Sequence, residues 1–134
     1  MKVERKNNGS VLLIAIFTIA LLSAVVMGIL QINTEEIQLM YNSINAARAL
    51  AIAEAGLNDA FAQIRADSAW SAGLDNKSFD GGSYTVTVTG TSPNLTILST
   101  GTSPQGFVAR VQAEVTLGVN SPYIIRIDKL RINE

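Results

Sequence analysis

The sequence predicts an α+β protein, with a long N-terminal α-helix, half membrane anchor and half amphipathic, packed against a small C-terminal antiparallel β-sheet of about four strands. Two patterns predict this fold class. An uncharged apolar run passes into a segment whose apolar residues follow helical spacing, and the second half of the chain alternates apolar and polar residues. The length of 134 residues suits one domain.

The composition excludes several classes of chemistry. The chain has no Cys and no His, so it offers no thiolate nucleophile, disulfide, imidazole base or Cys/His zinc site. No pairing of a nucleophile with a base and no glycine-rich phosphate loop is visible. The net charge of −1 lacks the basic footprint of a nucleic-acid-binding protein. We therefore expect no enzyme activity, no cofactor, no metal and no nucleic-acid partner.

The expected anchor comprises residues 10–31. Between Val11 and Leu30 the run holds no charge, and at ~1.5 Å per residue a helix of this length crosses a bilayer core of ~30 Å. Its Val, Ile, Leu and Phe side chains favour insertion into lipid by roughly 4 to 8 kcal/mol. The side chains that we expect in lipid or in the core of a helical assembly include Val11, Leu12, Leu13, Ile14, Ile16, Phe17, Leu21 and Leu22.

The charges that flank the run predict its orientation. Lys2, Arg5 and Lys6 precede it, whereas Glu35 and Glu36 follow it. By the positive-inside rule, the N-terminus stays in the cytoplasm and the C-terminal half is exported. A removable signal peptide is the competing interpretation, but its apolar region would be only ~7 to 15 residues long. The length of the run favours a single-pass anchor.

Residues 32–66 are expected to continue the same helix. The segment contains no Pro and only one Gly, and alanines are concentrated between residues 46 and 62. A face of small residues allows close packing. This face could admit the sheet of the same chain, neighbouring copies of the helix, or both on different sides.

The sheet is expected within residues 67–134. An irregular connection extends to Gly82, and four strands follow around residues 84–89, 95–97, 107–117 and 123–132. In the last strand the apolar phase slips, which predicts a bulge near Asp128 and Lys129. A segment of this length can form only a marginal hydrophobic core by itself. We therefore expect the sheet to pack on the helix around Leu50, Leu57, Phe61 and Ile64.

Three groups of polar residues each allow a structural and a functional interpretation. Glu54 is either a solvated helix residue near Asn58 or a contact to another subunit or to the sheet. A polar turn or a Ca²⁺ site is possible at Asp75, Asn76 and Asp80, although the spacing does not match an EF-hand. Protection of an edge strand or contact with phosphate or DNA is possible at Arg126, Lys129 and Arg131.

The arrangement resembles the type IV pilin superfamily over essentially the whole chain. Residues 1–9 resemble its basic leader peptide, which ends in Gly9 and is followed by Ser10 and the apolar run. The segment from Ala51 to Ala60, with Ala-Glu-Ala-Gly-Leu at its centre, resembles the PilX-like minor pilins and the K-type minor pseudopilins of type II secretion. So does Leu-Ser-Thr-Gly at residues 98–101, followed by a strand.

The resemblance implies a structural subunit of a type IV pilus or a secretion pseudopilus. A prepilin peptidase would cut between Gly9 and Ser10, and Ser10 would then be a candidate for methylation. The implied partners are other pilin or pseudopilin subunits, the inner-membrane assembly platform and membrane lipid. The implied location is the inner membrane, with an exported head, and then a surface pilus or a periplasmic pseudopilus.

One departure from the family pattern bears on the role of the subunit. Major pilins carry Glu as the fifth residue after the cut, where this chain has Ile14. An unpaired charge inside an apolar filament core costs several kcal/mol, and that Glu is thought to offset the amine of a neighbour. Its absence suits a subunit at the tip or in assembly initiation. A membrane-anchored binding or sensor module, and a tip subunit that binds DNA or surfaces, are the alternative functions.

Overall fold

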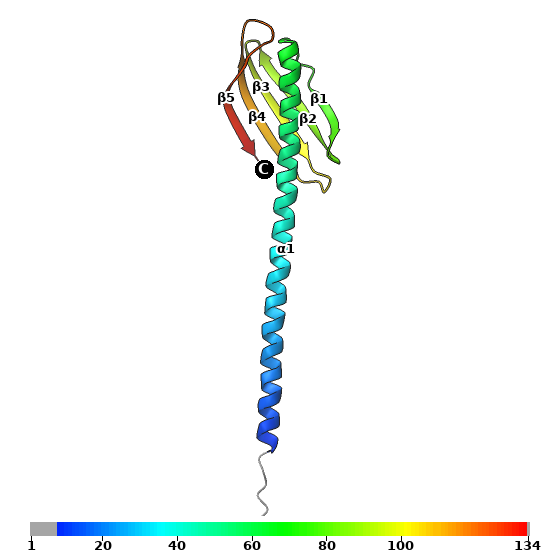
Figure 1. The fold of residues 1–134 in the computed structure, drawn as a ribbon, viewed down its shortest axis with the longest axis vertical. Helices are drawn as coiled ribbons and strands as arrows, with labels where there is room; N and C mark the ends of the chain where they lie inside the picture. The colour runs from blue at the N-terminus through cyan, green and yellow to red at the C-terminus, as the bar shows by residue number, and fades with distance from the viewer. Residues whose placement is uncertain (1–7, 134) are drawn as a thin grey trace, which may run out of the picture. The chain divides into compact units, whose positions relative to one another are not determined.

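A computed structural model describes residues 8–133. It has one helix and five strands in chain order: α1 (Asn8–Ala66), β1 (Leu74–Phe79), β2 (Gly82–Thr91), β3 (Asn94–Thr102), β4 (Val108–Leu117) and β5 (Ile125–Asn133) (Figure 1). The chain divides into two compact units, Met1–Tyr41 and Asn42–Glu134. The predicted α+β class is confirmed. We call the second unit, which holds the sheet and the part of α1 that covers it, the head.

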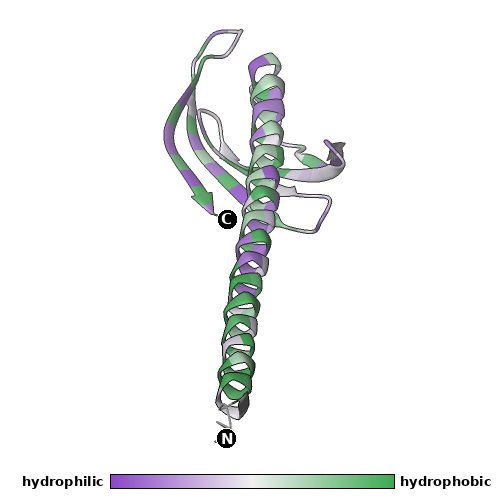
Figure 2. Cartoon of the chain, turned by 60° about the horizontal axis from the view of Figure 1, so that its bottom comes forward, coloured by the Kyte–Doolittle hydropathy of each residue, from purple (hydrophilic) through white to green (hydrophobic). Residues whose placement is uncertain are grey.

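The part of α1 in the first unit is exposed on all of its faces. Its large apolar side chains, from Val11 to Ile32, are each more than half exposed. Figure 2 shows that this stretch of the helix is predominantly hydrophobic. The hydroxyl groups of Thr18 and Ser23 donate hydrogen bonds to backbone carbonyl oxygens four residues earlier, each at 2.8 Å. Both hydroxyl groups are thus satisfied within the helix, which a nonpolar environment requires.

The five strands form one antiparallel meander in the order β1-β2-β3-β4-β5. Strand β1 lies where the sequence led us to expect an irregular connection, so that prediction was wrong. Asp80 and Gly81 connect β1 to β2 with positive φ angles of 48° and 76°. Two consecutive residues with positive φ are typical of a tight hairpin turn. This turn allows the polar segment before it to pair with β2 as a strand. A bulge between Leu74 and Lys77 explains why no regular alternation is visible there.

The bulge predicted in the last strand is confirmed. Lys129 lies opposite Glu114 and Ile127 lies opposite Val115, so Asp128 is the extra residue of β5. The strand begins at Ile125, two residues later than predicted. Because of the bulge, the aliphatic residues on both sides of Asp128 lie opposite buried residues of β4 and share the face of the sheet toward α1; they are Ile125, Ile127, Leu130 and Ile132.

Small residues bring α1 and the sheet into close contact. A Cβ atom added at Gly56 would lie 2.5 Å from Ser99 Oγ and 2.8 Å from Tyr84 Cδ2. In β3, a Cβ at Gly101 would overlap the backbone of Ala53 in α1. Part of the alanine-rich face therefore admits the sheet of the same chain, one of the two alternatives raised by the sequence. Around this contact lies a core that includes Leu57 and Ile64, with Leu50 and Phe61 packed against it, as expected.

The hydroxyl group of Ser99 gives a first prediction. This side chain is fully buried against Gly56, and Oγ has no hydrogen-bond partner among residues 8–133. A buried hydroxyl without a partner costs about 1–3 kcal/mol, so Ser99→Ala is expected to raise the free energy of unfolding of the head by about 1 kcal/mol. Urea unfolding of the full chain in detergent, followed by Trp70 fluorescence, measures the change. The control is Ser78→Ala, at an exposed position of the sheet, which should have little effect on the free energy of unfolding. Destabilisation by Ser99→Ala would contradict the prediction.

Candidate functional site

The first candidate surface is the apolar segment of α1 between Val11 and Ile32. Among the described residues, α1 is the one helix long and apolar enough to cross a membrane; its best window has a mean hydropathy of 2.8, and none of that window is buried. The residues predicted to lie in lipid or in a filament core all belong to this surface; for example, Phe17 is 66% exposed. A helix that is apolar all round requires burial by lipid or by other helices.

The predicted cleavage site lies at the start of this segment. Gly9 and Ser10 are exposed residues of the first turn of α1. The basic residues predicted to precede the cut lie outside the described residues. Ile14, at the position where major pilins carry a carboxylate, is exposed within the apolar surface. No acidic side chain is present between Gly9 and Thr34, so the segment offers no partner for an amine at Ser10.

The second candidate surface is a groove between α1 and β5. Residues of both elements line it, with one residue of β4: Glu54, Leu57, Asn58, Phe61, Val111, Ile127 and Leu130. We call this the α1/β5 groove. Glu54 is exposed, and no hydrogen bond or ion pair joins it to another described residue. Glu54 is therefore an unpaired carboxylate beside an apolar groove, and its predicted role in assembly stays a prediction.

A polar cluster that the sequence did not reveal joins α1 to the edge of the sheet at β1. The Lys77 ammonium lies 2.5 Å from Asp59 Oδ2, and the Tyr84 hydroxyl donates to the same oxygen at 2.8 Å. These hydrogen bonds, with that of Lys77 the larger influence, hold the pKa of the Asp59 carboxyl below its ordinary 3.8. The cluster links the helix to strands β1 and β2.

The cluster predicts how stability depends on pH. Because its pKa is lower in the folded chain, the Asp59 carboxylate stabilises the head fully above its ordinary pKa of 3.8, and this contribution is lost as pH falls through the folded value. Asp59→Asn is expected to lower the free energy of unfolding by about 1 kcal/mol at pH 7, and by less below pH ~4. Urea unfolding at several pH values measures the difference. The control is Asp75→Asn, at an exposed position of β1, which should change the free energy of unfolding at pH 7 very little. An equal loss at all pH values for Asp59→Asn would contradict the assignment.

Two of the three residues considered for Ca²⁺ binding, Asp80 and Asn76, have structural roles. Asp80 accepts a hydrogen bond from Arg48 Nε at 2.8 Å, and its carbonyl oxygen accepts one from Arg48 Nη2 at 2.7 Å. Asn76 belongs to the bulged part of β1, with a φ of 42°. Within residues 8–133 no group of three or more acidic, His or Cys side chains is placed to hold a metal ion. Asp80 thus links the β1–β2 turn to the helix.

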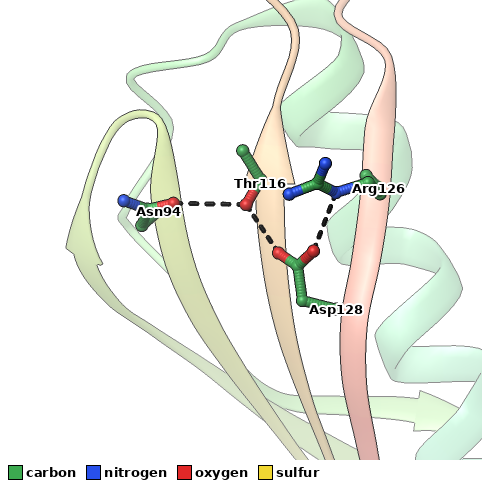
Figure 3. A network of polar contacts seen from close by, with 4 residues as sticks. All are labelled: Asn94, Thr116, Arg126 and Asp128. Atoms are coloured by element: carbon green, nitrogen blue, oxygen red, sulfur yellow. Dashed lines mark hydrogen bonds and ion pairs between the residues drawn. The ribbon is translucent and has the colours of Figure 1, made fainter.

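The basic residues of the last strand lie on the sheet face directed away from α1. Asp128, at the bulge, is 2.8 Å from Arg126 and accepts a hydrogen bond from the Thr116 hydroxyl at 2.5 Å (Figure 3). Asn94 also lies within hydrogen-bond distance of that hydroxyl. Because a hydroxyl has one hydrogen, the shorter contact with the charged carboxylate is favoured. The Thr116 and Arg126 contacts lower the pKa of Asp128. Strand β5 is an edge strand, as the protective interpretation of these cations requires.

Comparison with known proteins does not assign a family. No family model, no curated protein and no solved structure matches the chain. Function is therefore inferred from the two surfaces described above and from the sequence features at the N-terminus.

Proposed function

We propose that the protein is a minor pilin or pseudopilin, a structural subunit of a type IV pilus or a type II secretion pseudopilus that acts at the tip or in assembly initiation. The observation that carries this proposal is the apolar segment of α1, which is uncharged and exposed on every side while the same helix continues into a folded head. Such a segment is stable in lipid and equally among similar helices, which are the two environments that a filament subunit occupies in turn.

Removal of the leader would prepare the chain to pass from the membrane into a filament. The leader contains Lys2, Arg5 and Lys6 and one acid, Glu4, so the mature chain has 10 − 3 = 7 basic and 11 − 1 = 10 acidic residues, a net charge of −3. In the membrane, the three cations keep the N-terminus on the cytoplasmic side. In the core of a filament they would be charges in an apolar environment, each of which costs several kcal/mol unless paired. Cleavage after Gly9 removes these three cations and leaves a single charge, the amine of Ser10.

A place at the tip accounts for Ile14. In the major pilins that this chain resembles, a carboxylate of one subunit is thought to offset the terminal amine of its neighbour, because an unpaired buried charge is costly. A subunit with Ile14 supplies no such carboxylate from its apolar segment. It therefore suits a position where no neighbour depends on it, and it is poorly suited to the body of the filament.

Mass spectrometry of the protein extracted from its host membrane tests the proposal. In cells that have a prepilin peptidase, we expect a chain that begins at Ser10 and a small amount of this chain in sheared filaments. Gly9→Leu is expected to leave the leader attached and to remove the protein from filaments entirely. Gly28→Leu is the matched control, because a Cβ atom at either glycine meets nothing within 4 Å.

Two outcomes would contradict the proposal. An intact leader on the wild-type chain would favour the anchored binding or sensor module, which needs no cleavage. Normal incorporation of Gly9→Leu into filaments would show that processing does not control assembly. DNA binding as the main function is the weaker proposal, because two of the three cations of this cluster, Arg126 and Arg131, each lie within 4 Å of a carboxylate.

A further inference from the structure

Strand β5 leaves one long edge of the sheet open. It is the last strand in the sheet order, so no strand of residues 8–133 pairs with its outer edge. The opposite edge strand, β1, has six residues and is interrupted by a bulge, which protects it from pairing. Strand β5 also carries a bulge, at Asp128, but it has nine residues and aliphatic side chains along one face, whereas β1 is short and mostly polar. Of the two edges, the one at β5 is the better template for an added strand.

The face of β5 toward α1 is apolar and incompletely covered. Ile127, Leu130 and Ile132 are each about half exposed, at 50%, 51% and 50%. Their opposite residues in β4 are almost fully buried beneath the helix. The helix thus covers β4 more fully than β5, and Ile127 and Leu130 line the β5 side of the α1/β5 groove. An added strand would bury them further if its own side chains on this face were aliphatic.

The other face of β5 has an excess of positive charge. Arg126 is neutralised by Asp128, and Arg131 lies 3.7 Å from Glu114. Lys129 lies opposite the same Glu114, but no ion pair joins it to a described residue. Two cations therefore share one carboxylate on this face. Like charges directly across a strand pair are destabilising, whereas opposite charges attract.

We propose that β5 binds an extended segment of a different chain as a sixth strand, in which aliphatic residues face α1 and acidic residues lie across from Lys129 and Arg131. The open edge can accept a strand, the half-exposed aliphatic side chains match an apolar face, and the two cations attract acids on the other face. The β5 strand of a second copy fits poorly, because antiparallel pairing would bring its cations beside those of the first. This interaction does not depend on the pilin function and would serve an anchored module equally.

A designed peptide tests the proposal with the full chain in neutral detergent. The probe is a capped peptide of alternating valine and glutamate with terminal glycines, and its control has lysine in place of glutamate. We expect saturable binding of the glutamate peptide and affinity at least about tenfold lower for the lysine peptide. Hydrogen exchange of the β5 amides should slow in the complex, since an added strand would protect its outer edge.

Charge exchange in the protein makes the test specific. The double variant Lys129→Glu with Arg131→Glu is expected to reverse the preference, so that the lysine peptide binds more tightly. Arg110→Glu is the matched control, because Arg110 is an exposed cation on the same face but belongs to β4. If the double variant fails to fold by circular dichroism, Lys129→Gln provides the readout and should reduce the preference severalfold.

Three outcomes would overturn the proposal. The first is the absence of saturable binding up to about 1 mM, which corresponds to a negligible affinity. The second is equal binding of both peptides, or a preference that the changes at Lys129 and Arg131 leave intact. The third is protection from hydrogen exchange outside β5, which would place the peptide elsewhere on the chain.

Discussion

Gly101→Ala is expected to destabilise the head by about 3 kcal/mol or more, enough to unfold a large fraction of a small domain. The added Cβ atom would lie 2.9 Å from the Cα atom of Ala53 and closer still to the Ala53 nitrogen and the Ala49 carbonyl oxygen. These are backbone atoms of a helix, so no side-chain rotation relieves the overlap. The whole helix would have to move away from β3, and the tightly packed core would open along the contact.

Thermal and urea unfolding of the full chain in detergent, followed by near-ultraviolet circular dichroism, measure this effect. Gly106→Ala is the control. Gly106 has a φ of 85° but its Cβ atom would meet nothing within 4 Å, so it isolates the conformational cost, about 1–2 kcal/mol. A smaller loss for Gly101→Ala than for Gly106→Ala would show that α1 does not approach β3 as closely as described.

Leu21→Arg combined with Leu22→Arg is expected to abolish membrane insertion. The aliphatic and aromatic residues of the apolar run favour insertion by roughly 4 to 8 kcal/mol, whereas each arginine at the centre of a span costs about 2.5 to 3.5 kcal/mol. Two arginines therefore offset most or all of the gain, and the loss of two leucines removes about 1 kcal/mol more. One arginine alone leaves the balance in favour of the membrane.

Alkaline carbonate extraction of membranes measures the change. The wild type and either single variant are expected in the pellet, and the double variant in the supernatant or in aggregates. Ala62→Arg combined with Gln63→Arg adds the same two charges at exposed positions of α1 in the head and should leave the protein in the pellet. Retention of the Leu21 and Leu22 double variant in the membrane would contradict the assignment of this segment as a span.

The parts of the fold that were predictable are those set by local periodicity. Helical spacing and the absence of Pro predicted α1, and the alternation around Val111 and Val115 predicted β4 and its buried face. The phase slip between Ile127 and Leu130 predicted the bulge, because an extra residue is the simplest way to keep both side chains on one face. In each case the information lies within one element.

The missed features depend on contacts between distant segments. Strand β1 is polar and bulged, and its signal is the Asp80–Gly81 pair, which is typical of a two-residue hairpin turn. The ion pair between Asp59 and Lys77 spans 18 residues and that between Arg48 and Asp80 spans 32. Such pairs form only when the helix has a fixed rotation and position on the sheet, which packing determines and local spacing does not.

The α1/β5 groove could not be predicted from the sequence, because it too depends on how the helix packs on the sheet. The sequence places aliphatic residues on one face of the last strand, and on a sheet fully covered by the helix they would be core. The helix covers only the strands beneath it, so the exposure of Ile127 and Leu130 follows from the width of the sheet relative to the helix. The Ala-Glu-Ala-Gly-Leu motif singles out Glu54 in the sequence, but only the fold places this residue beside the groove.

The hydrogen bonds of Thr18 and Ser23 have a consequence for any change of surroundings. Because each hydroxyl already bonds to a carbonyl oxygen of its own helix, neither relies on a lipid headgroup, a water molecule or a residue of another chain. A helix with this property can move from lipid into a bundle of other helices without breaking the hydrogen bonds of these two hydroxyl groups. Only dispersion contacts are exchanged, so the difference in free energy between the two media is small, and modest forces suffice to drive the transfer in either direction.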